Sequence, residues 1–153
     1  MSTHEITTAV NGRSRSAQVQ ARTSLADLLR AEFGLTGTHV SCEQGHCGAC
    51  TVLLDGLPVR SCLVLAVQVD GAEVETVENL PDGGLQAAMR EEHGLQCGFC
   101  TPGLLMSLAH AEREQLPADE VLTEVLPAHL CRCTGYGGIR AAVERHWNGR
   151  EQR

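Results

Sequence analysis

Apolar and polar residues alternate at the start of the chain in a pattern that predicts a β-hairpin. Residues 5–10 and 16–20 read as two short strands, and Asn11-Gly12 lies between them. An Asn-Gly pair favours a tight hairpin turn because both residues tolerate a positive φ angle. We therefore expect the chain to begin with two paired strands.

A short helix is expected next. Ser24 is a typical helix N-cap, with Asp27 three residues further on, and Gly34 is a typical helix end. Between them, four apolar residues recur at helical spacing: Leu25, Leu28, Leu29 and Phe33.

Short apolar runs between residues 51 and 77 predict further strands. The candidates are 51–54, a returning strand from Val59 that carries Cys62, 64–69 and 74–77. Turns at Asp55-Gly56 and Asp70-Gly71 separate them. Two strands, a helix and then more strands predict an α+β arrangement.

The pattern changes to short helices after residues 81–84, which read Pro-Asp-Gly-Gly. The expected helices are 85–93, one capped by Thr101 with Pro102 at its first position, one opened by Pro117, and 139–147. Four short helices predict a small bundle. We expect two domains, residues 1–80 and 81–153.

The charge balance changes the range of expected partners. The chain of 153 residues has a formal net charge of -7 and no Lys/Arg-rich run, which argues against nucleic acid or an anionic membrane. The longest apolar stretches, 62–67 and 103–109, are too short to span a bilayer. No membrane insertion and a cytoplasmic location are expected.

Eight cysteines fall into two groups of four. The first is Cys42, Cys47, Cys50 and Cys62, and the second is Cys97, Cys100, Cys131 and Cys133. Disulfides do not suit a reducing cytosol. Zinc accepts four thiolates, so the second group alone is open to a structural zinc site. With only two Phe, one Tyr and one Trp, two small domains would have small cores that gain from a metal site.

The first group has the spacing C-x4-C-x2-C with a distant fourth cysteine, which is typical of plant-type [2Fe–2S] centres. Three sulfurs must reach the irons from one short loop, and Gly45 and Gly48 supply the backbone freedom that such a loop needs. In the second group, Cys97 and Cys100 precede one expected helix, and Cys131 and Cys133 precede another. Helix N-termini are favourable for thiolates.

Three segments resemble the xanthine oxidase family of molybdenum hydroxylases. The first is 37–62, which contains the first cysteine group. The second is Gln96-Cys97-Gly98-Phe99-Cys100-Thr101-Pro102-Gly103. The third is Leu130-Cys131-Arg132-Cys133-Thr134-Gly135-Tyr136. The resemblance extends from Leu25 to Ala142 and is to the separate small subunit of bacterial members. It departs from the family at Ala128 and His129, where Gly-Asn is common, and at His46, where small or acidic residues are common.

The resemblance implies a plant-ferredoxin-like β-grasp domain followed by a four-helix bundle. It also implies that the first cysteine group holds the [2Fe–2S] cluster distal to molybdenum and the second group the proximal one. Gln96 and Cys133 would contact the molybdopterin. The chain would perform no bond-making itself and would have no catalytic residue.

The partners implied by the resemblance are a large subunit with molybdenum and molybdopterin, in its cytosine dinucleotide form, and a medium subunit with FAD. The expected assembly is a heterotrimer that can dimerise. Electrons would run from molybdenum through both clusters to FAD while an aldehyde, a purine, another N-heterocycle or carbon monoxide is oxidised. The alternative is a free-standing two-cluster ferredoxin.

The histidines have a simpler interpretation. His39 and His46 flank the first cysteine loop, but all four ligand positions there are filled by cysteine, so neither is expected to bind iron. Surface or hydrogen-bonding roles are expected for them and for His110, His129 and His146.

Overall fold

A mixed five-stranded sheet forms the N-terminal unit of the protein, whose computed structural model describes residues 2–151. The strands are β1 (Thr3–Val10), β2 (Arg13–Gln20), β3 (Thr51–Leu54), β4 (Leu57–Arg60) and β5 (Glu73–Glu75). Their order is β2-β1-β5-β3-β4. β1 pairs antiparallel with β2 and parallel with β5. The hairpin expected at Asn11-Gly12 is confirmed, since Val10 pairs with Arg13.

A short helical segment packs on this sheet. It begins as α1 (Leu25–Asp27) and continues as a π-helical turn, η1 (Leu28–Glu32). The Ser24 hydroxyl accepts a hydrogen bond of 3.0 Å from the Asp27 N–H, so the predicted cap is confirmed. The core of the unit is made by apolar residues of the helix and the strands, which include Leu25, Leu28, Leu29, Val10, Val52 and Val74.

Two of the predicted strand positions are wrong. Cys62 lies in a turn beyond the end of β4, and part of the run 64–69 forms a 3-10 helix, η2 (Ala66–Val69). The Gln68 side chain accepts a hydrogen bond of 2.9 Å from the Leu65 N–H, which closes this turn. Strand β5 ends at Glu75, and a second 3-10 turn, η3 (Val77–Asn79), follows it.

The C-terminal unit is helical, as predicted. It consists of α2 (Gly84–Glu91), α3 (Thr101–Arg113), α4 (Ala118–Glu120) with its continuation in η4 (Val121–Val125) and η5 (Leu126–Ala128), and α5 (Gly137–Glu151). Thr101 does not cap α3, because Cys100 occupies the N-cap position and the Thr101 hydroxyl is buried without a hydrogen-bond partner among residues 2–151. Pro117 is itself the N-cap of α4.

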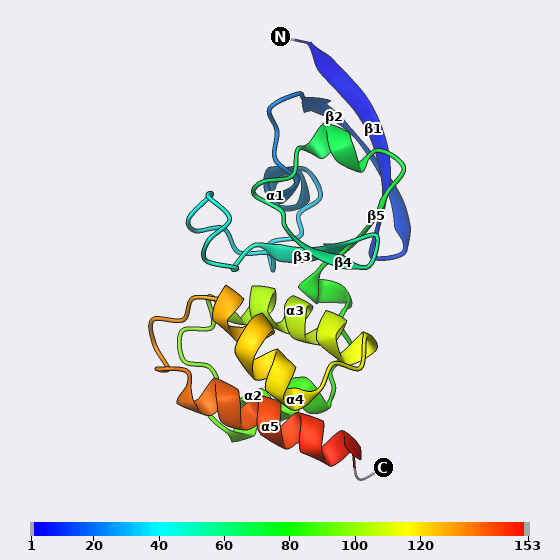
Figure 1. The fold of residues 1–153 in the computed structure, drawn as a ribbon. Coiled ribbons are helices and arrows are strands. Elements are labelled where there is room, and N and C mark those ends of the chain that lie inside the picture. The colour runs from blue at the N-terminus through cyan, green and yellow to red at the C-terminus, as the bar shows by residue number, and fades with distance from the viewer. Residues whose placement is uncertain (1, 152–153) are drawn as a thin grey trace.

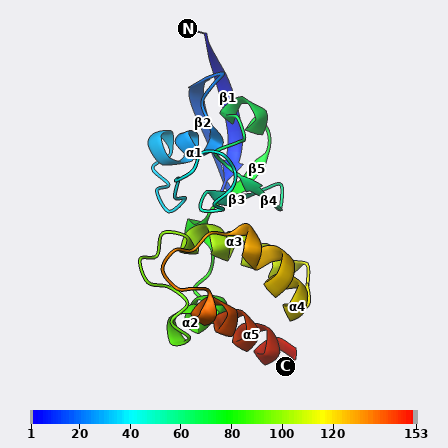
Figure 2. The same cartoon turned by 60° about the vertical axis from the view of Figure 1, so that its left-hand side comes forward.

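The two units are stacked end to end, with the termini at opposite ends of the molecule (Figure 1). Helix α3 packs against the β3–β4 hairpin, and α2 and α5 lie on the side of the helical unit that faces away from the sheet in both views (Figure 2). The helical core includes Leu104, Leu108 and Trp147, whose Nε1 donates to the Leu116 carbonyl at 2.8 Å. None of the helices within residues 2–151 has the length and apolar character needed to cross a bilayer.

Polar contacts join the two units away from the cysteines. Arg113 on α3 donates to both carboxylate oxygens of Glu75 on β5, at 2.7 and 2.8 Å. His110 Nδ1 lies 3.0 Å from the Gly56 carbonyl oxygen in the β3–β4 turn. The Arg113 guanidinium lowers the pKa of the Glu75 carboxyl, as expected for a two-bonded ion pair.

We expect Arg113→Met to destabilise the protein by about 1 kcal/mol, because it removes this ion pair. For a chain of this size, that loss lowers the thermal midpoint by about 2–4 °C at pH 7. Since the pKa of Glu75 is lowered on folding, the contribution is present above the ordinary glutamate pKa and is lost as the pH falls through the lowered value. The control is Arg90→Met, whose partner Asp82 lies 3.5 Å away on an exposed surface. Equal midpoints for Arg113→Met and Arg90→Met would contradict the expectation.

Candidate iron–sulfur centres

The first cysteine loop turns sharply enough to present several sulfurs from one short segment. Glu43, Gly45 and Gly48 have φ angles of 51°, 77° and 78°. The two glycines adopt this left-handed conformation without the strain that a Cβ would add. A Cβ on Gly45 would also lie 2.5 Å from Leu63 Cδ1, so the Leu63 side chain packs closely against the loop at this point.

Backbone N–H groups in this loop point at sulfur. The N–H groups of Gln44 and Cys47 each donate to Cys42 Sγ at 3.4 Å. These two donors, that of Cys47 first, lower the pKa of the Cys42 thiol to about 6. The thiolate is the form that binds metal, so the loop favours the ligand form of Cys42.

Cys62 is brought to the loop by the turn after β4. The Ser61 N–H and hydroxyl both donate to the Cys50 carbonyl, at 3.2 and 2.7 Å, and hold the two segments together. Burial, followed by the neighbouring Cys50 thiol, raises the pKa of Cys62 to about 11. The structure thus gathers the fourth predicted ligand from a distant part of the chain.

The second cysteine group lies on two loops that lead into helices. Cys97 and Cys100 precede α3, and Cys131 and Cys133 precede α5. The sulfurs of Cys97 and Cys133 lie 3.4 Å apart, and the Cys131 sulfur lies 3.1 Å from the Thr134 hydroxyl. These two loops bring together residues that are far apart in the sequence, as predicted.

Hydrogen bonds also shape the second site. The Phe99 N–H donates to Cys97 Sγ at 3.5 Å and lowers the pKa of that thiol, whereas burial raises the pKa of Cys100 to about 12. The Tyr136 hydroxyl accepts a bond of 2.9 Å from the Cys131 N–H. Sulfurs that receive N–H donors and lie on sharply turning loops suit an iron–sulfur centre at each group.

No group of three or more His, Cys, Asp or Glu side chains within the described residues is arranged to hold a single metal ion. A [2Fe–2S] centre divides its four thiolates between two irons, so its ligands need not converge on one point.

The two sites adjoin one another. A cavity of about 470 Å³ at the second site is lined by Cys97, Cys100, Cys131 and Cys133, and also by Cys47 from the first loop. The Leu130 N–H donates to the Cys47 carbonyl at 2.9 Å. All the cysteine loops therefore lie on one side of the molecule, the left in Figure 1, opposite the β3–β4 turn.

The two residues that the resemblance places near molybdopterin are at the surface. Gln96 and Cys133 are both exposed, and the Gln96 side chain makes no hydrogen bond to the part of the chain that the structure describes. Arg132, between two of the cysteines, is exposed as well.

Three histidines lie near the cysteine loops, and one of them is buried. His46 is exposed, while His39 stacks on the Phe99 ring at a centroid distance of 4.8 Å and bonds the Phe99 carbonyl through Nδ1. His129 is buried, and burial together with the nearby Arg60 guanidinium lowers its pKa to about 4, so the ring is neutral at pH 7. Nothing in the local sequence indicates this burial, because the groups around the ring come from distant segments.

Two family models match the chain. The model described as "2Fe-2S iron-sulfur cluster binding domain" matches residues 8–73, and the one described as "[2Fe-2S] binding domain" matches residues 76–144. The chain thus has two [2Fe–2S]-binding regions, one in each structural unit.

Similar proteins are subunits of larger oxidoreductases. Caffeine dehydrogenase subunit gamma of Pseudomonas sp. (strain CBB1) is 52% identical over 152 residues, covering 94% of this chain and 91% of its own. The nicotine 6-hydroxylase small subunit of Paenarthrobacter nicotinovorans is 52% identical over 143 residues, covering 91% and 87%.

Solved structures give the same result. A chain of quinoline 2-oxidoreductase from Pseudomonas putida 86 superposes with a TM-score of 0.86 at 45% identity, covering 97% of this chain and 99% of that chain. Aldehyde oxidoreductase from Desulfovibrio gigas also gives 0.86, at 37% identity, but the match covers only 17% of that longer chain. Together with the cysteine loops and the two matched domains, these likenesses confirm the resemblance: the chain belongs to the iron–sulfur small subunits of the xanthine oxidase family of molybdenum hydroxylases, and its part in the oxidoreductase is non-catalytic electron transfer.

Proposed function

We propose that this subunit relays electrons from a molybdopterin centre on a large partner subunit, through the helical unit's centre and then the sheet unit's centre, to FAD on a medium subunit. The ligands would be Cys97, Cys100, Cys131 and Cys133 for the proximal [2Fe–2S] centre and Cys42, Cys47, Cys50 and Cys62 for the distal one. The clusters supply one-electron carriers, and the chain holds them in series.

The observation that supports this orientation is the surface around the second site. Cys97 and Cys133 are exposed, and large apolar side chains beside them are exposed too: Phe99 is 44% exposed and Leu130 is 59% exposed. Apolar side chains that gather at a surface are typical of a protein interface. We infer that the large subunit covers this surface, which we call the Leu130 surface, formed by Phe99 and Leu130 at the mouth of the same cavity.

Gln96 and Cys133 lie beside the Leu130 surface and are free to meet a cofactor held by the large subunit. A side-chain amide carries both donors and an acceptor, which suits the edge of a pterin ring. In the same proposal, the Cys133 sulfur binds iron and accepts a hydrogen bond from the pterin.

The names of the relatives with the highest identity support one substrate class. Caffeine, nicotine and quinoline are named in three of them, and all three compounds contain an N-heteroaromatic ring. We propose an N-heteroaromatic substrate for the holoenzyme, bound on the large subunit, since a substrate pocket belongs to the catalytic chain. An aldehyde or carbon monoxide is the alternative.

We further propose that the two domains are residues 1–80 and 81–153. Separate apolar cores and separate family matches support this division. A cytoplasmic location, the cytosine dinucleotide form of the cofactor and a heterotrimer that dimerises stay predictions.

Leu130→Asp tests the orientation. A carboxylate in the middle of an apolar interface is costly to bury, so we expect the variant to lose the large subunit during purification while both clusters remain. The measurement is the mass of the purified complex with its molybdenum and iron contents. Leu57→Asp is the matched control, because Leu57 is 62% exposed at the start of β4, next to the β3–β4 turn on the opposite side of the molecule. Wild-type chain that purifies alone would instead support a free-standing ferredoxin.

A further inference from the structure

We propose that His129 is a positioning residue: its ring holds the first cysteine loop against the segment that carries Cys131 and Cys133, and so sets the coupling between the two [2Fe–2S] centres. The proposal rests on the ligand sets given above, and it adds a role for a residue that binds neither iron nor pterin.

The His129 ring fills the space between helix α3 and the first cysteine loop. Its side chain is 2% exposed, and its Nε2 lies 2.8 Å from the hydroxyl of Ser107, a buried residue of α3. Its Nδ1 is buried against Gly48 and has no hydrogen-bond partner of its own among the described residues. The ring is therefore fixed by one hydrogen bond and by close packing.

The His129 ring leaves no room for a side chain at Gly48. A Cβ at Gly48 would lie 2.5 Å from His129 Nδ1 and 2.7 Å from the Ala128 carbonyl oxygen. A Cβ at Gly103 of α3, one turn before Ser107, would clash with the Gly48 carbonyl oxygen. The loop beside Cys47 is thus in close contact with both the first turn of α3 and the His129 ring.

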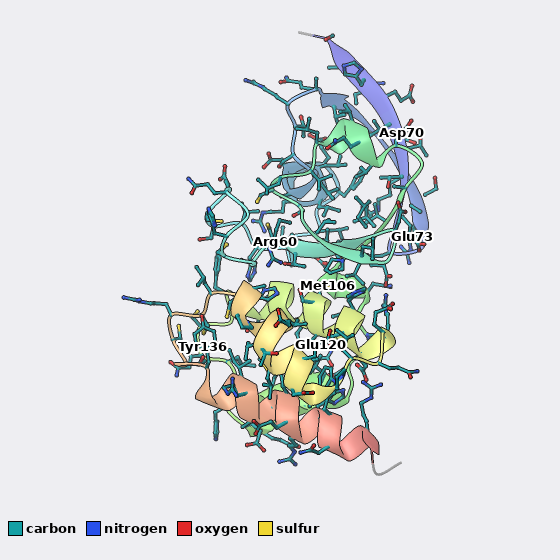
Figure 3. All side chains as sticks on the ribbon, viewed as in Figure 1. Arg60, Asp70, Glu73, Met106, Glu120 and Tyr136 are labelled. Carbon is teal, nitrogen blue, oxygen red and sulfur yellow. The ribbon has the colours of Figure 1, made fainter. Side chains whose placement is uncertain are left out.

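The residues on both sides of His129 are attached to the sheet unit. The Leu130 N–H donates to the Cys47 carbonyl at 2.9 Å, and Arg60 Nη2 donates to the Ala128 carbonyl at 2.7 Å. Figure 3 shows Arg60 at the boundary between the two units. These two hydrogen bonds hold the segment to the sheet unit, and the ring fixes how closely the segment approaches the first cysteine loop.

This arrangement matters for electron transfer because the exchange rate between two centres falls steeply with their separation. The Leu130 N–H bond reaches the carbonyl of Cys47, a proposed ligand of one centre, and Leu130 is followed directly by Cys131, a proposed ligand of the other. A side chain that fixes this junction fixes the distance and orientation of the two centres. Replacing His129 changes this junction but none of the proposed cysteine ligands.

The test compares His129→Ala with His129→Gln in the full chain as it purifies with its partners. Alanine removes the ring and its contact with Ser107, whereas glutamine can place an amide nitrogen where Nε2 lies. In His129→Ala we expect both clusters to assemble, the magnetic splitting between the two reduced centres to be lost from the electron paramagnetic resonance spectrum, and amide exchange at Leu130 to rise. His129→Gln should restore both properties in part.

His110→Ala is the matched control, because His110 also bridges the two units but does so at the β3–β4 turn. It should keep the wild-type splitting. The proposal is overturned if His129→Ala holds both clusters with wild-type splitting and wild-type exchange at Leu130. If His129→Ala loses a cluster, Ser107→Ala decides: altered splitting supports the proposal, and wild-type splitting refutes it. The splitting arises between two centres on this chain and needs no electron entry from molybdenum, so failure of the electron route proposed above would be seen separately.

Discussion

Cys131→Ser is expected to remove one of two electron paramagnetic resonance signals from the reduced protein, and Cys62→Ser the other. Wild-type chain should contain about four irons and four acid-labile sulfides, and each variant about two of each. The reason is that the two residues belong to different structural units, each with its own apolar core. Loss of one ligand in one unit need not empty the site in the other.

The comparison between the two variants contains its own control, since each should keep the signal that the other loses. A variant that loses both signals while the chain stays folded would show that the ligands are wrongly grouped. Zinc as the dominant metal, or a colourless folded protein, would contradict the cluster assignment itself.

Gln96→Leu is expected to leave both clusters in place and to weaken the link to molybdenum. Leucine has a similar size but can neither donate nor accept, so the variant loses the proposed amide contact with the pterin. A lost hydrogen bond of about 1.4 kcal/mol corresponds to about tenfold weaker retention of the molybdenum cofactor. Electron exit from reduced molybdenum, followed as cluster bleaching after substrate is added, should slow as well.

Gln44→Leu is the control for this experiment, because Gln44 is an exposed glutamine in the other cysteine loop. It should leave molybdenum content and the first electron step unchanged. A complex in which the first cysteine group lies nearest molybdenum, with Gln96 far from the pterin, would refute the expectation.

Local signals in the sequence predicted much of the fold. The hairpin at Asn11-Gly12 and the cap at Ser24 depend on residues that are neighbours in the chain, and both are present. The family resemblance supplied the β-grasp and bundle architecture. Prediction failed at 64–69, because a short apolar run reads alike as a buried strand or as a 3-10 turn, and the Gln68 side chain selects the turn.

The spacing of Cys42, Cys47 and Cys50 is local and indicated the first centre, and the family resemblance supplied the ligands of the second, but the contacts between the two sites could not be predicted. The burial of His129 depends on Ser107 in α3 and on Gly48 in the first cysteine loop. Cys100 at the N-cap of α3 displaced Thr101 from the role that its side chain favours. The surroundings of His129 and the conformation at Thr101 are thus set by the folded cysteine loops, and the local sequence around each residue does not show them.

The buried position of Trp147 gives this protein an optical probe of one half of its structure. It is the single tryptophan of the chain, it is 4% exposed, and it lies in the helical core. The wavelength of its fluorescence therefore reports on the helical unit alone, whereas circular dichroism responds to both units. If the two transitions coincide on denaturation, the units unfold together. If they separate, the order in which they separate shows which cluster-bearing unit opens first.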